Sequence, residues 1–140
     1  MKPLTTAVFL VAGFWSSSGL SAQTKPQHNG KQKTLSVCEL LEHAKQYEGR
    51  VVTVRGRVIA DMHSTAIAED ACGRAVVIRY DVKAQPEAFV EGVEAKRGLM
   101  DKRSFVVTVM GRFQARVRGS SGYFSRVEVS RALEYKFVQD

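Results

Sequence analysis

Residues 50–58 read Arg-Val-Val-Thr-Val-Arg-Gly-Arg-Val, and this stretch decides the fold. Valine and threonine are β-branched and suit the pleated, half-buried surface of a strand. Because side chains alternate along a strand, the pattern places Val52, Val54 and Val58 on one face and the polar side chains on the other. The stretch therefore predicts a long strand with one buried face.

The same pattern returns later in the chain. Residues 51–57 line up with residues 106–112, and each segment carries a glycine before its final arginine, Gly56 in the first and Gly111 in the second. A glycine within a strand often marks a bulge or a sharp bend. Two long strands bent at matching glycines predict a small closed barrel.

The N-terminus has the order of a secretory signal. Lys2 gives a positive start, residues 7–15 form an apolar run, and small residues lead to Ala22, after which we expect cleavage. The apolar run is too short to span a bilayer. An uncleaved N-terminal anchor is the alternative interpretation. A cleaved signal would place the mature chain in the periplasm or outside the cell.

A polar leader follows the signal. Residues 23–34 include Pro26 and Gly30 and carry too little apolar surface to order themselves, which predicts a flexible segment. The chain has 140 residues in all. Without residues 1–22 this is the size of one domain, and we assign that domain to residues 35–138.

The chain has two cysteines, Cys38 and Cys72. In an exported protein such a pair usually forms a disulfide. The alternative is a reactive thiol at Cys38, because this residue lies near the start of a predicted helix, where the pKa of a thiol is lowered. The sequence has no Cys-x-x-Cys motif. We therefore expect the disulfide.

Two helices are predicted. Residues 36–47 carry one apolar stripe at helical spacing, and Ser36 with Glu39 three residues on forms a capping box. We expect this helix to cap one end of the barrel. Residues 86–96 have a weaker helical pattern, because Gly92 lowers helix propensity.

Five strands are predicted, at residues 50–62, 65–68, 74–82, 104–118 and 124–137. On the last strand, alternation predicts that Val127, Val129 and Leu133 point inward. The weaker helix falls between the third and fourth strands. The residues that carry this pattern most clearly are 47–58 and the hairpin at 68–78.

With its long, glycine-bent first and fourth strands, this order resembles the OB-fold, a five-stranded Greek-key barrel. The resemblance covers residues 35–137 and is to the small exported bacterial proteins of that fold. It implies a mainly β domain with an N-terminal capping helix. It also implies a ligand face on the second and third strands, flanked by the loop between the first two strands and the loop at residues 118–124.

Positive charge suggests the kind of ligand. The chain has 21 Lys and Arg against 14 Asp and Glu, a net charge of +7, and a basic balance favours polyanions. On the long strands, arginines alternate with the apolar residues and so lie on the outward face. We predict that they converge into a patch suited to phosphate or carboxylate. The predicted ligand-binding residues are Arg55, Arg57, Arg112, Arg116, Arg118 and Tyr123. The alternative is an Arg-rich surface with ordinary cross-strand Arg–Glu pairs.

No catalytic motif stands out. The sequence lacks a Ser-His-Asp arrangement, a phosphate loop and a paired-carboxylate motif, so we do not expect an enzyme. Asp61, His63, Glu69 and Asp70 are irregularly spaced and make a poor metal signature, so we expect neither metal nor cofactor. We expect a monomeric, non-enzymatic binding module for an anionic envelope ligand or a protein partner. The alternative is a single-stranded nucleic-acid-binding protein.

Overall fold

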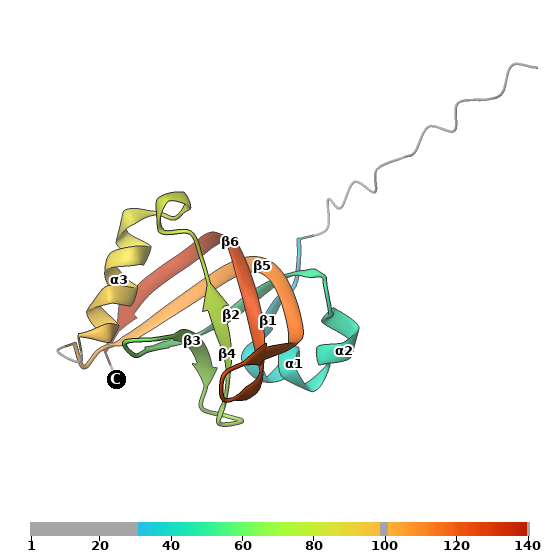
Figure 1. The fold of residues 1–140 in the computed structure, drawn as a ribbon. Helices are drawn as coiled ribbons and strands as arrows, with labels where there is room; N and C mark the ends of the chain where they lie inside the picture. The colour runs from blue at the N-terminus through green and yellow to red at the C-terminus, as the bar shows by residue number, and fades with distance from the viewer. Residues whose placement is uncertain (1–30, 99–100, 140) are drawn as a thin grey trace, which may run out of the picture.

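Strands dominate the computed structural model, which describes residues 31–98 and 101–139 (Figure 1). In chain order the elements are β1 (Thr34–Ser36), α1 (Val37–Glu42), α2 (Ala44–Tyr47), β2 (Val51–Ala60), β3 (Thr65–Glu69), β4 (Arg74–Arg79), the 3-10 turn η1 (Val82–Ala84), α3 (Glu87–Arg97), β5 (Ser104–Gly119) and β6 (Gly122–Val138). The predicted signal segment lies outside the described residues, so cleavage after Ala22 stays a prediction.

The strands close into a barrel. Their hydrogen-bonded order is β1-β2-β3-β4-β6-β5, and β5 returns to pair with β2. The β2–β5 ladder is antiparallel and runs from the pair Val51–Arg112 to the pair Arg57–Val106. It joins the first and fourth of the five predicted strands, while β4 and β6 pair in parallel. The predicted mainly β, OB-fold barrel is confirmed.

The two predicted helices lie on opposite sides of this barrel (Figure 1). The weaker one is present as α3, and Gly92 is the point at which it packs most closely, because a Cβ there would overlap the ring of Phe105. Phe89 and Val93 of α3 are fully buried. The residue that weakened the helical pattern is therefore the one that lets the helix approach the sheet. Within the described ranges, no helix has the length and hydrophobicity needed to cross a bilayer.

The N-terminal helix is capped as predicted but is interrupted. Both hydrogen bonds of the Ser36–Glu39 capping box are present. The helix breaks at His43, which separates α1 from α2. Thr34, which we had assigned to the leader, is the first residue of β1 and lies opposite Thr53 of β2 in a parallel pair. The ordered part of the chain thus starts before residue 35.

Bulges in β6 change the alternation of its side chains. In the β5–β6 ladder, Thr108 lies opposite Glu134, whereas the next residue of β5 lies opposite Ala132. Leu133 is the extra residue. Ala132 takes the inward position at 6% exposure and Leu133 is 42% exposed, so the prediction that Leu133 points inward is wrong. Val127 and Val129 are buried as predicted.

Gly111 stands where β5 and β6 come closest. A Cβ on this residue would overlap the carbonyl oxygen of Glu128 and lie 2.8 Å from the Cα of Val129. The close backbone approach, and not a positive φ, requires glycine here. The site is less tight at Gly56, where a Cβ would lie 3.0 Å from the carbonyl oxygen of Ala68.

The predicted disulfide between Cys38 and Cys72 is confirmed, with an S–S distance of 2.05 Å and a Cα–Cα distance of 5.9 Å. It ties α1 to the hairpin between β3 and β4. The side chain of Glu69 adds a second link, because its carboxylate accepts a hydrogen bond of 2.9 Å from the backbone N–H of Cys38. The capping helix is thereby held against the barrel covalently and by a hydrogen bond.

We expect Gly111→Ala to lower the free energy of unfolding by about 3 kcal/mol, because the added methyl group cannot be accommodated without moving two strands apart. Gly98→Ala is the control, since a Cβ at Gly98 meets its nearest atom at 3.8 Å. Urea denaturation of both variants measures the difference. Equal stability of Gly111→Ala and the parent would show that β5 and β6 are not this close.

Replacing both Cys38 and Cys72 with serine should cost about 3–4 kcal/mol of stability, because the bond closes a loop with a sequence separation of 34. The reduced parent should match the double variant in urea denaturation. Alkylation of the unreduced protein, followed by mass spectrometry, should label no thiol. Two labelled cysteines in the unreduced protein would contradict the disulfide.

Candidate functional site

The predicted arginine patch does not converge. In the β2–β5 ladder, Arg55 lies opposite Thr108. Arg112 lies opposite Val51, four residues further along, which corresponds to roughly 13 Å at the rise of a strand. Arg55 instead faces Glu134 of β6, with 3.7 Å between the charged groups. The prediction that these guanidinium groups meet is wrong. Alternation along a strand determines the face on which a side chain lies, but the distance between side chains on paired strands depends on the register.

Two of the predicted arginines make local structural contacts. Arg57 pairs with Asp70 at 2.6 Å, and both side chains are exposed. Arg112 donates a hydrogen bond of 2.7 Å to the backbone carbonyl of Gly49. Exposed ion pairs of this kind add little stability. Asp70 nevertheless neutralises the charge of Arg57, and the carbonyl of Gly49 takes up an N–H donor of Arg112 that an anionic ligand would need.

The remaining predicted residues lie together on the hairpin that joins β5 and β6. The guanidinium carbon of Arg116 lies 3.9 Å from the ring centroid of Tyr123, a cation–π contact. Arg118 is the ladder partner of Tyr123. The structure therefore brings three of the six predicted residues to one hairpin and leaves the other three on the barrel wall.

A cavity of about 710 Å³ lies on the face that the resemblance implies. Its walls come from the loop between β2 and β3, the end of β4, the end of α3 and the loop between β5 and β6. The volume is within the range of small-molecule sites, roughly 300–1,000 Å³. None of the six predicted ligand-binding residues is among the described residues that line it.

Positive charge surrounds this cavity. Arg79, Arg97 and Arg126 line it, and Glu94 is the one acid among its described lining residues. Arg97 is held in place, because it pairs with Glu94 at 3.0 Å and donates to the hydroxyl of Thr65 at 2.9 Å. Its Nε is buried and has no hydrogen-bond partner among the described residues. The cavity thus holds an incompletely satisfied guanidinium.

The other two guanidinium groups differ in their surroundings. Arg126 donates to the side-chain oxygen of Gln114 at 2.8 Å and pairs with Glu128 at 2.8 Å, which fixes its orientation. Arg79 is exposed, and its side chain has no hydrogen bond or ion pair within the described ranges. Arg79 is therefore the cation most available to a ligand.

Aromatic rings complete the cavity wall. Phe124, which is half-buried, lines the cavity, and so does Tyr80. The ring of Tyr80 packs edge-on against Phe89, with 5.2 Å between ring centroids. Burial raises the pKa of the Tyr80 phenol, since a phenolate is poorly solvated there. A tyrosine is protonated at neutral pH even without this shift, so Tyr80 offers a neutral hydroxyl group there.

The loop between β2 and β3 owes its shape to Asp61. One oxygen of its carboxylate accepts hydrogen bonds of 2.7 Å from the backbone N–H groups of both His63 and Ser64. These bonds lower the pKa of Asp61. Asp61, His63, Glu69 and Asp70, which we considered as a cation site, do not form a ligand group among the described residues. Glu69 belongs instead to a group with Cys38 and Cys72, whose sulfurs are bonded to each other.

Part of the cavity could have been found in the sequence. Alternation places Arg79 on the outward face of the third predicted strand and Arg126 on the outward face of the last one. Arg97 gave no such signal, because it reads as part of a charged connection after a weak helix. Its contact with Thr65, 32 residues earlier, depends on how α3 packs against the barrel.

Comparison with known proteins gives no family. No family model and no curated protein match this chain. Among solved structures, asparaginyl-tRNA synthetase from Pyrococcus horikoshii is 17% identical with a TM-score of 0.47, over 77% of this chain and 23% of that one. The structure titled "OBody AM3L09 bound to hen egg-white lysozyme" is 17% identical with a TM-score of 0.43, over 68% and 87%. At this distance, function has to be argued from the site.

Asp61 provides a test of the cavity loop. Because its pKa is lowered in the folded protein, its stabilising effect is present above the ordinary value of 3.8 and is lost as the pH falls below it. NMR should show the amide resonances of His63 and Ser64 shifting on acidification, with a midpoint below 3.8. Asp61→Ala should abolish that transition and mobilise the loop, whereas Asp61→Asn should retain more order. A midpoint at or above 3.8 would contradict the two hydrogen bonds.

Proposed function

We propose that this protein is an exported, non-enzymatic binding module that holds an anionic ligand in the cavity lined by Arg79, Arg97 and Arg126. The ligand is an anionic component of the cell envelope or an acidic segment of a protein partner. The observation that carries the proposal is the unpaired charge of Arg79. Of the three arginines that line the cavity, Arg97 pairs with Glu94 and Arg126 pairs with Glu128, whereas the side chain of Arg79 has no partner in the described chain.

Guanidinium groups suit this task. Each presents a planar set of N–H donors that matches the geometry of carboxylate and phosphate oxygens. Arg79 is without a partner in the described chain, and Arg97 has an unsatisfied Nε. An anion in the cavity would supply acceptors to Arg79, whereas the buried Nε of Arg97 is closed to it. Because part of the cavity wall is buried, the attraction would be stronger there than at an open surface.

Export is supported by two independent features. The order of residues 1–22 is that of a secretory signal. The bond between Cys38 and Cys72 is of the kind that persists in oxidising compartments. Together they favour the periplasm or the cell exterior, where anionic polymers are abundant.

A second candidate is a single-stranded oligonucleotide. The specific observation in its favour is the ring of Phe124 in the wall of the cavity, close in sequence to the exposed ring of Tyr123. Bases stack on such rings while arginines follow the phosphates. A ligand with bases should then bind more tightly than a polyphosphate of equal charge.

The test compares Arg79→Gln with Arg74→Gln, which makes the same change of charge at the other end of β4. Tripolyphosphate, a carboxylate polymer and oligothymidylate serve as probes in calorimetric titrations of the full chain. We expect Arg79→Gln to weaken binding by about tenfold, the value of one charge-assisted hydrogen bond, and to flatten its dependence on salt. The control should bind as the parent does. Unchanged affinity in Arg79→Gln would reject the cavity as the site.

A further inference from the structure

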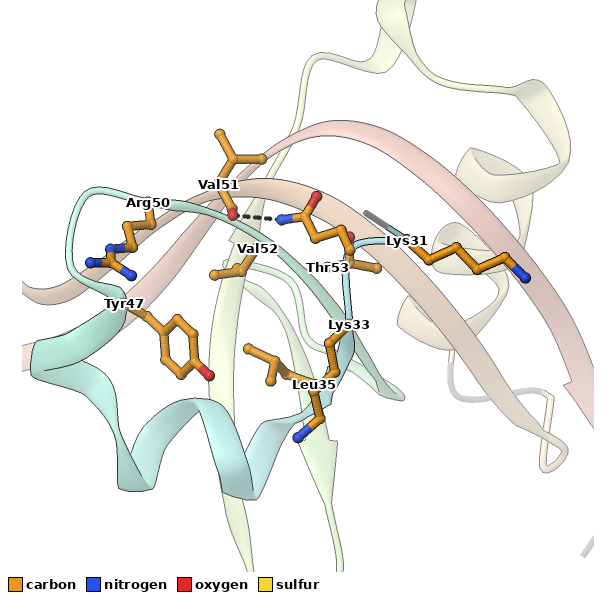
Figure 2. A pocket seen from close by; sticks show the side chains of 9 residues that line it. Lys31, Lys33, Leu35, Tyr47, Arg50, Val51, Val52 and Thr53 are labelled. Atoms are coloured by element: carbon orange, nitrogen blue, oxygen red, sulfur yellow. Dashed lines mark hydrogen bonds between the residues drawn. The ribbon is translucent and has the colours of Figure 1, made fainter. Parts of the chain in front are cut away.

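A second hollow, of about 700 Å³, lies beside β1 and away from the arginine cavity. It is bounded by residues 31–33, the end of α2 and the first half of β2 (Figure 2). Leu35 and Val52 form an apolar floor and are buried, at 4% and 3% exposure. Val51 also lines the hollow and is 48% exposed. The hollow thus combines a buried apolar base with an exposed apolar edge.

Three cations surround this apolar base. Lys31, Lys33 and Arg50 line the hollow, and none of its described lining residues is acidic. Figure 2 shows their charged ends on different sides, with Arg50 on the α2 side, the amine of Lys33 beside Leu35, and the Lys31 side chain extending away on the opposite side. Lys33 pairs with Glu39 at 2.9 Å, whereas the side chains of Lys31 and Arg50 have no partner in the described chain. Cations spread in this way suit an array of anions better than a single one.

Polar groups in the hollow are placed for an interfacial contact. The side chain of Gln32 donates a hydrogen bond of 2.7 Å to the backbone carbonyl of Val51, which holds the segment before β1 at the rim. Thr53 is 4% exposed and its hydroxyl has no hydrogen-bond partner among the described residues. The ring of Tyr47 points toward Leu35 (Figure 2). Tyrosine is enriched where apolar and polar environments meet at a membrane surface.

We propose that this face docks on an anionic lipid surface, with Lys31, Lys33 and Arg50 at the headgroup phosphates and Val51 and Tyr47 in the interfacial layer. Charge complementarity supports the assignment, because each cation near an anionic surface raises affinity roughly fivefold.

The proposal does not depend on the arginine cavity, since the two sites share no lining residue. A protein that fails to bind soluble anions through Arg79 would still dock through Lys31 and Arg50. In the same way, loss of lipid binding would leave the cavity and its ligand untouched. The two proposals therefore fail separately.

The experiment uses the full chain with vesicles of phosphatidylcholine, with and without phosphatidylglycerol. Sedimentation measures binding, and hydrogen exchange measures protection of the backbone around Arg50 and Val51. Lys31→Gln/Arg50→Gln is compared with Arg74→Gln/Lys83→Gln, an equal change of charge at exposed positions outside the hollow. We expect phosphatidylglycerol to strengthen binding by the parent and to protect these amides. The first double variant should lose about 25-fold in affinity for the anionic vesicles, and the second should lose little.

Three results would overturn the proposal. The first is equal affinity for neutral and anionic vesicles, which would assign any binding to the apolar N-terminal run. The second is equal loss of affinity in both double variants, which would reduce the effect to net charge. The third is protection of the same amides by soluble tripolyphosphate as strong as that by anionic vesicles, which would make the hollow a site for a free anion.

Discussion

The close approach of β5 and β6 at Gly111 is the contact on which the rest of the structure depends. Backbone atoms of Glu128 and Val129 occupy the space that a side chain would need. The bulges of β6 near this point coil the long hairpin, so that β5 can pair with β2 while β6 pairs with β4. The barrel closes for this reason, and the faces of all its strands follow from that closure.

Closure also determines where charge can gather. On the barrel wall, Arg55 and Arg57 meet acids from other strands, Glu134 and Asp70, and their charge is balanced. At the mouth of the barrel, elements that are distant in the sequence bring arginines to one cavity with fewer acids. Among the arginines of this cavity, Arg79 at the end of β4 is the one whose charge is unpaired within the described chain.

Local patterns predicted most of the fold and little of the site. The repeated valine motif, the capping box at Ser36 and the cysteine pair depend on neighbours in sequence or on compartment, and the structure confirms the strands, the cap and the disulfide. Leu133 was misplaced because a bulge depends on the partner strand. Arg97 was missed because its contact with Thr65 joins α3 to β3, and such a contact arises only when the helix packs against the closed barrel.

The most direct test of this account is an NMR titration of the isotopically labelled full chain with tripolyphosphate. The account predicts that the largest shifts fall on Arg79, Arg97 and the loop at residues 120–121, which line one cavity. It predicts small shifts at Arg55 and Arg112 on the barrel wall. Largest shifts at Arg55 and Arg112, with the cavity residues unchanged, would contradict it.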